Sequence, residues 1–199
     1  MEVYVNNEPA HVVPFSFDLS SLVPRSVASL YSHLVTRPTG RALRLGIESQ
    51  IAELGASCIS VLDFKQVVVL DYSCADEAVA KLIRRFQPEG RPSDAYFLAR
   101  GVAEQHREPL EEVLIRHGLV MAAEVEGIGF TLLGAPSLLE QLSWAALQRA
   151  GSATVGEVAL AVQHSEVEVA SALESLAYRR ALVPGEPAGR YIALSALLP

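Results

Sequence analysis

The sequence is poor in cysteine, in aromatic residues and in long apolar runs. The shortage of cysteine and of apolar runs each excludes a class of protein. The chain has 199 residues, of which 2 are cysteines and 7% are aromatic. Two cysteines do not make a disulfide framework, so the pattern favours a reducing compartment, the cytoplasm. The longest apolar runs, such as VVVL at residues 67–70, are too short to cross a bilayer, so no membrane partner is expected. No basic segment followed by an apolar stretch opens the chain, and we expect no export signal.

Signatures of catalysis are also missing. The sequence has no P-loop, no dinucleotide fingerprint and no GxSxG motif. Its histidines show no ligand spacing such as HxH or HExxH; they are His11, His33, His106, His117 and His164. We therefore predict a protein that is not an enzyme and that has no cofactor and no metal site.

The charge balance limits the partners. The formal net charge of −7 argues against a surface built throughout for nucleic acid, although it permits a local basic patch. Half of the residues are hydrophobic and 20% are charged, which is typical of an ordered globular protein. The length suits one large domain or two small ones.

The pattern divides the chain in two. Residues 1–134 predict an α/β (α+β) domain, a mixed sheet with helices packed on it. The expected strands are residues 3–5, 11–18, 59–64, 66–70 and 95–99 with a hairpin at 120–125 and 130–133, and the expected helices are residues 26–34, 41–54, 76–85 and 109–117. The helix at 41–54 is expected to bury the stripe Ala42, Leu45, Ile47, Ile51, Ala52 and Leu54.

Residues 138–199 predict a second, small domain. Helices are expected at residues 138–150, 154–162 and 165–180, followed by extended segments at 181–184 and 190–194 around a Gly/Pro-rich tip. Three helices followed by a two-stranded ribbon are the order of a winged helix.

The most distinctive chemistry lies where a strand turns into a helix, at Asp71-Tyr72-Ser73. A serine hydroxyl and free backbone N–H groups at a helix N-terminus would stabilise a phosphate on Ser73. Ser73 is therefore either a phosphoacceptor or partner-binding residue, or a purely structural N-cap. Asp76 and Glu77 in the first turn suit the helix dipole under both interpretations, and Cys74 is best explained as a small buried hydrophobe.

A basic cluster opens the helix at residues 41–54. Arg41 and Arg44 lie three residues apart, on one side of that helix, with Arg37 just before it. The three arginines form a solvated face, or Arg41 and Arg44 instead hold an acidic partner or pair with the Asp76–Glu77 turn.

Residues 41–85 resemble the STAS-like superfamily, which is named for sulfate transporters and anti-sigma factor antagonists. The resemblance rests on GRALRLGIE, on the strand ISVLDF and on the turn DYSCADEA. The turn is most similar to a bacterial STAS-like branch that reads roughly Ser-Phe-Ala-Asp-Glu; here it is Ser73-Cys74-Ala75-Asp76-Glu77.

The resemblance implies a regulatory role. In anti-sigma factor antagonists the turn reads Asp-Ser-Ser-Gly, and a GHKL-type kinase that is also the anti-sigma factor phosphorylates the second serine. Ser73 falls at that acceptor and Asp71 at the motif's aspartate, whereas Tyr72 and Cys74 depart from the pattern. The implied partner is a protein of the kinase or anti-sigma factor type, bound around Asp71, Ser73, Asp76 and Glu77.

The C-terminal segment TVGEVALAVQHSEVEVASALESLAYRRALV resembles a bacterial winged helix-turn-helix, which raises the question of DNA. Its third helix carries Glu166, Glu168 and Glu174, whose charge opposes contact with phosphates. A DNA-binding transcriptional regulator would need Arg179, Arg180 and Arg190 as its phosphate-contacting edge. We favour protein contact or homodimerisation for this domain, with DNA as the alternative.

Overall fold

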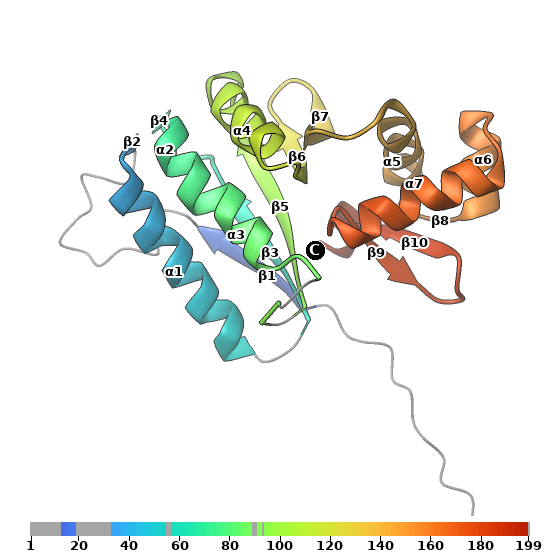
Figure 1. The fold of residues 1–199 in the computed structure, drawn as a ribbon, viewed down its shortest axis with the longest axis horizontal. Helices are drawn as coiled ribbons and strands as arrows, with labels where there is room; N and C mark the ends of the chain where they lie inside the picture. Colours follow the sequence, from blue (N-terminus) through green and yellow to red (C-terminus); the bar gives the residue numbers. More distant parts are fainter. Residues whose placement is uncertain (1–12, 19–32, 55–56, 89–90, 93, 199) are drawn as a thin grey trace, which may run out of the picture.

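The computed structural model describes residues 13–18, 33–54, 57–88, 91–92 and 94–198. The predicted strand at residues 3–5 and most of the predicted helix at 26–34 lie outside these ranges. Before residue 135 the elements are β1 (Val13–Asp18), β2 (His33–Leu34), α1 (Arg37–Leu54), β3 (Cys58–Asp63), β4 (Val69–Leu70), α2 (Tyr72–Ala75), a π-helical turn (Asp76–Ala80), α3 (Lys81–Arg85), β5 (Ala95–Val102), α4 (Glu104–Arg116), β6 (Val120–Val125) and β7 (Gly129–Gly134) (Figure 1).

Five strands form one sheet, in the order β1-β3-β5-β6-β7. The first four run parallel, and β7 pairs antiparallel with β6 through the predicted hairpin. β2 and β4 form a separate parallel pair of two residues each. The chain is therefore a mixed α/β protein, and the prediction of a mixed sheet with helices packed on it is confirmed at this level.

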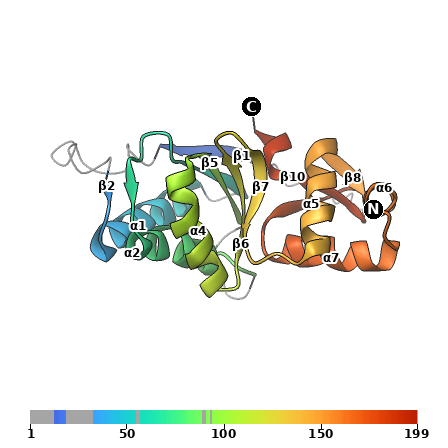
Figure 2. The ribbon, with the colours of Figure 1, turned by 90° about the horizontal axis from the view of Figure 1, so that it is seen from above.

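The central strands are buried on both faces, which explains their nearly continuous apolar sequences. Phe97 and Ala99 of β5 belong to a core shared with α1, α3 and α4, whereas Tyr96 and Leu98 belong to a second core. The second core continues into the C-terminal elements, including Trp144. Figures 1 and 2 show α1, α2 and α4 gathered on one side of the sheet and the C-terminal elements on its other side. The sheet thus separates two cores.

The C-terminal elements follow the predicted order of three helices and a two-stranded ribbon. They are α5 (Leu138–Ala150), β8 (Ser152–Thr154), α6 (Val155–Val162), α7 (Glu166–Tyr178), β9 (Leu182–Gly185), β10 (Arg190–Ala193) and a 3₁₀ turn (Leu194–Leu197). β8, which the sequence analysis missed, joins the ribbon in an antiparallel sheet of order β8-β10-β9. Each helix begins with a capping box in which a serine or threonine pairs with a glutamate three residues later.

The predicted apolar stripe of α1 was right at Ile47 and Ile51 and wrong at its other four residues. Ala42, Leu45, Ala52 and Leu54 are exposed, and the buried residues are Gly40, Leu43, Ile47 and Ile51. The helix carries apolar residues on two overlapping stripes, so periodicity alone does not decide which face meets the core. The close approach of a neighbouring helix at Gly40 decides it.

Three further boundaries differ from the prediction. His33 and Leu34, expected to end a helix, form β2, because they pair with β4. Only Val69 and Leu70 of the expected strand at 66–70 are paired. α4 begins at Glu104 rather than at Pro109, which lies buried inside it. One proline removes a single backbone hydrogen bond, and burial of this helix face compensates for that loss.

Candidate functional site

Asp71 organises the turn between β4 and α2. Its Oδ1 accepts a hydrogen bond from the Cys74 N–H at 2.6 Å and one from the Ser73 hydroxyl at 3.0 Å. Asp71 is therefore the N-cap of α2, and the interpretation of Ser73 as the cap is wrong. Both residues are good caps, but the backbone turns from extended to helical at Asp71, so its carboxylate receives the free N–H group.

The same carboxylate fastens a second segment. Asp71 Oδ2 accepts a hydrogen bond from the Thr36 N–H at 3.0 Å, and the Asp71 N–H donates to the Leu34 carbonyl at 3.0 Å. Partial burial alone would raise the pKa of Asp71, but the hydrogen bonds from Thr36, Cys74 and Ser73 outweigh it and lower the pKa. Asp71 is thus held as a carboxylate that joins the residues before α1 to the start of α2.

Ser73 lies half-buried in the first turn of α2, with its hydroxyl as a donor to Asp71. Cys74 beside it is fully buried, and burial followed by the charge of Asp71 raises its pKa to about 12. Its thiol is therefore neutral at physiological pH and packs as a small hydrophobe. Of the two side chains, Ser73 is the one that presents a reactive group near solvent.

Asp76 and Glu77 are buried and paired, rather than displayed to a partner. Asp76 accepts hydrogen bonds from Arg37 at 2.9 Å and pairs with His117 Nε2 at 2.7 Å. Glu77 pairs with Lys81 and with Arg37 at 3.2 Å, and lies 3.7 Å from Arg44.

This ion-pair network joins three helices. Arg37 and Arg44 come from α1, Asp76 and Glu77 from the π-helical turn, and His117 from the end of α4. Partial burial would raise the pKa of Asp76, but bonds from His117 and Arg37 outweigh it and lower the pKa. Lys81 is the main cause of the lowered pKa of Glu77. The network therefore holds the helices together around two ionised carboxylates.

An exposed apolar surface borders Ser73. It consists of Val68 and Val69 before the turn and Tyr72 within it, which are 54%, 40% and 40% exposed. The Val68 carbonyl accepts a hydrogen bond from Gln105 at 2.9 Å, so this surface adjoins α4. Partial burial and the carboxylate of Glu108 raise the pKa of Tyr72. We call Val68, Val69, Tyr72 and Ser73 the Tyr72 patch.

The three C-terminal arginines proposed to contact DNA are engaged within the chain. Arg179 pairs with Glu140 and donates to the Ala135 carbonyl at 3.2 Å. Arg180 is 9% exposed; it pairs with Asp94 at 2.7 Å and lies over the Tyr96 ring, 4.8 Å from its centroid. Arg190 lies 3.9 Å from Glu157 and hydrogen-bonds Ser152 at 3.3 Å.

The exposed face of α7 is acidic and apolar. Glu166 and Glu168 occupy its first turn, and Val167 between them is 81% exposed. Leu160 of the preceding helix is 83% exposed. Such a surface opposes a phosphate backbone and suits contact with protein.

Sequence reasoning found the turn that carries Asp71, Ser73, Asp76 and Glu77, but it missed most of the partners of Asp76 and Glu77. Pairing of Arg41 and Arg44 with the Asp76–Glu77 turn was one of the interpretations left open, and it holds for Arg44. The roles of Arg37 and His117 in that network were missed. Arg37 and Asp76 are 39 residues apart in the chain, and no local pattern connects them. Tyr72 could have been identified as a candidate contact residue from the sequence, since it is an aromatic residue inside the distinctive polar turn.

Across the described ranges, no group of three or more His, Cys, Asp or Glu side chains could hold a metal ion. None of the helices described here combines the length and the apolar character needed to span a membrane.

Comparison with models of protein families gives no match for this chain, and comparison with curated proteins gives no significant match.

Proposed function

We propose that this chain is a cytoplasmic, non-enzymatic regulatory protein that acts by contact with another protein. The contact surface is the Tyr72 patch, and the charge on Ser73 controls it. In this proposal residues 1–134 are a STAS-like domain and residues 138–199 a winged-helix domain. The partner is of the kinase or anti-sigma factor type, as the similarity of the turn to anti-sigma factor antagonists implies.

The hydrogen bond between Ser73 and Asp71 carries the proposal. A phosphate on Ser73 would replace that donor with a group of charge about −2 beside an ionised carboxylate. The repulsion would weaken the cap of α2 and the bond from Asp71 to Thr36 together. Because Tyr72 and Val69 flank these groups, the change would also alter the exposed apolar surface.

The C-terminal unit supports the same class of function. Its strand order and helix order fit a winged helix. Arg179 and Arg180 are committed to pairs with Glu140 and Asp94, and the exposed residues of α7 are acidic and apolar. These observations favour contact with protein, including a second copy of the chain, over the alternative of DNA binding.

The test begins with purification of the tagged, nuclease-treated chain from its own host. Mass spectrometry would identify the stoichiometric partner and the modification state of the Ser73 peptide. Affinity for that partner is then compared among wild type, Ser73→Ala, Ser73→Asp and the control Ser49→Asp, an exposed serine on α1. We expect Ser73→Asp to weaken binding by about tenfold or more, since it removes a charge-assisted hydrogen bond and adds repulsion. Equal affinities for wild type, Ser73→Ala and Ser73→Asp would contradict the proposal.

A further inference from the structure

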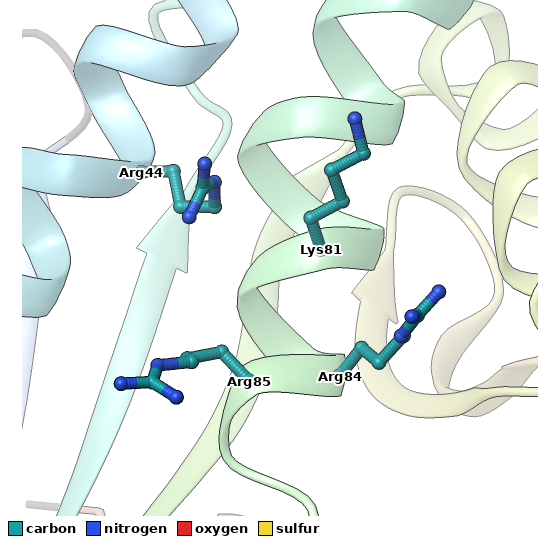
Figure 3. A pocket seen from close by; sticks show the side chains of 4 residues that line it. All are labelled: Arg44, Lys81, Arg84 and Arg85. Carbon is teal, nitrogen blue, oxygen red and sulfur yellow. The ribbon is translucent and has the colours of Figure 1, made fainter. Parts of the chain in front are cut away.

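Among the residues that the structure describes, a second surface, separate from the Tyr72 patch, is lined by cations. Arg44 of α1 and Lys81, Arg84 and Arg85 of α3 surround a pocket of about 360 Å³. Figure 3 shows Arg44 facing α3 across the gap between the two helices. Lys81 lies one turn before Arg84 and Arg85, and of these two Arg85 extends toward the α1 side and Arg84 away from it. Lys81 is a helix-face neighbour of both Arg84, three residues on, and Arg85, four residues on, so the two arginines flank it on either side.

The charges in this pocket are only partly neutralised. Arg44 pairs with Glu48 at 2.8 Å, and Lys81 pairs with Glu77. Arg84 and Arg85 are exposed and have no acidic partner within the described ranges. Like charges three or four residues apart on a helix repel each other and destabilise it. The helix dipole favours cations in the last turn and offsets part of this repulsion. It does not explain why four cations from two helices line one pocket.

We infer that this pocket binds the phosphoryl group of a small ligand, a free phosphate or a phosphate ester. A phosphate monoester carries a charge of about −2 at neutral pH, which matches the two arginines that lack acidic partners. Arginine presents planar N–H donors that fit phosphate oxygens in pairs. Arg44, across the pocket, and Lys81, one turn before the two arginines, are already held by Glu48 and Glu77 and contribute prearranged donors.

The surroundings favour a small ligand over a nucleic acid. The pocket volume falls within the range of about 300–1,000 Å³ that is typical of small-molecule sites. None of the described residues that line it is aromatic, whereas single-stranded nucleic acids are bound by stacking bases on aromatic side chains. Glu48 and Glu53 follow on α1, so the cations do not continue along that helix as a track for a backbone.

The pocket is independent of the proposed function. Ser73 and Arg84 are separated by eleven residues of helical chain, roughly 16 Å at the usual rise. Ser73 and Arg84 can therefore be changed separately, and loss of either activity leaves the other measurable.

Calorimetric titration of the full chain tests the inference, with pyrophosphate, inorganic phosphate, ADP and a single-stranded oligonucleotide as probes. The variants are Arg84→Gln/Arg85→Gln, the charge-preserving Arg84→Lys/Arg85→Lys, and the control Arg149→Gln, an exposed arginine on α5. We expect saturable one-to-one binding of pyrophosphate and ADP, weakened about tenfold or more by the glutamine pair and less by the lysine pair. The control should bind as wild type does.

Several results would overturn the inference. They are no saturable binding of any small probe, equal binding by wild type and the glutamine pair, and an equal loss in Arg149→Gln. Binding of the oligonucleotide alone would point to a nucleic-acid surface instead. Far-UV circular dichroism of each variant checks that the fold is retained, which is expected because Arg84 and Arg85 are exposed.

Discussion

At the scale of single residues, Glu140 shows how one carboxylate serves two purposes. Its Oε2 accepts a hydrogen bond from the Ser137 N–H at 2.6 Å and completes the capping box of α5. Its Oε1 pairs with Arg179 at the end of α7. Burial alone would raise the pKa of Glu140, but Arg179 and the Ser137 N–H outweigh it and lower the pKa to about 2. The ionised carboxylate is therefore favoured in the folded state.

This pair predicts a dependence of stability on acid. Since the folded pKa lies below the ordinary value of 4.5, the stabilisation is fully present above that pH and is lost as the pH falls towards 2. We expect Glu140→Gln to lower the free energy of unfolding by about 1.5–3 kcal/mol at neutral pH, because hydrogen bonds to a charged group are lost. Urea unfolding at a series of pH values should show the difference from wild type shrinking below pH 4.5.

Glu174→Gln provides the control for this experiment, since Glu174 is an exposed acid on α7. It should change the free energy of unfolding by less than about 0.5 kcal/mol at every pH. A difference between wild type and Glu140→Gln that stays constant from neutral pH to pH 2 would show that ionisation of Glu140 is not its source.

Residue roles were predictable only where they are local. The turn at Asp71–Ser73 was recognised from the sequence, because a polar turn between an apolar strand and an amphipathic helix is a short-range pattern. Asp71 caps the helix in place of Ser73 because of its own backbone φ and ψ angles, which the sequence does not specify. The partners of Asp76 come from other helices and become neighbours only through packing.

At the scale of elements, Gly40 sets the distance between α1 and α2. A Cβ atom at Gly40 would lie 2.6 Å from the Cys74 carbonyl oxygen and 2.9 Å from the Glu77 Cβ. The first of these is a backbone atom, so the helices would have to move apart. Any such movement would also stretch the pairs from Arg37 and Arg44 to Glu77.

We therefore expect Gly40→Ala to destabilise the protein, although alanine is the better helix former by about 1 kcal/mol. Overpacking of this kind costs about 1–3 kcal/mol, which exceeds that gain. The measurement is the midpoint of thermal unfolding. Gly156→Ala in α6 is the matched control, because its nearest neighbour is the flexible end of Glu166 at 3.3 Å. A midpoint for Gly40→Ala at or above that of Gly156→Ala would contradict this account of the contact.

The elements themselves were largely predictable, and their exceptions have a common cause. α5, β3 and the β6–β7 hairpin were expected within a residue or so, because strong periodicity and clear turn residues bound them. β2, β4 and β8 contain two or three residues each and exist through pairing with distant strands. The buried face of α1 likewise depends on Gly40, whose role appears only when α2 is in place.

At the scale of the whole molecule, the sheet makes the two cores interdependent. Leu98 faces the core that contains Trp144, while its neighbour Phe97 faces the core that contains Cys58 and Cys74. Arg180 adds a polar link, since it pairs with Asp94 just before β5 and covers Tyr96 on that strand. The sequence indicated two units joined by a short connection, but it could not show that the second unit packs on the sheet of the first, on the face opposite α1, α2 and α4.

A shared sheet predicts unfolding in a single step. The chain provides one probe for each core, the fluorescence of its single tryptophan and the reactivity of Cys58 and Cys74, which are both buried. We expect the two probes to give the same urea midpoint in wild type. Leu98→Ala should lower both midpoints equally, because it leaves a cavity costing about 2–5 kcal/mol in the strand common to both cores. Thiols that react at urea concentrations where Trp144 keeps its native fluorescence would show instead that the two cores unfold separately.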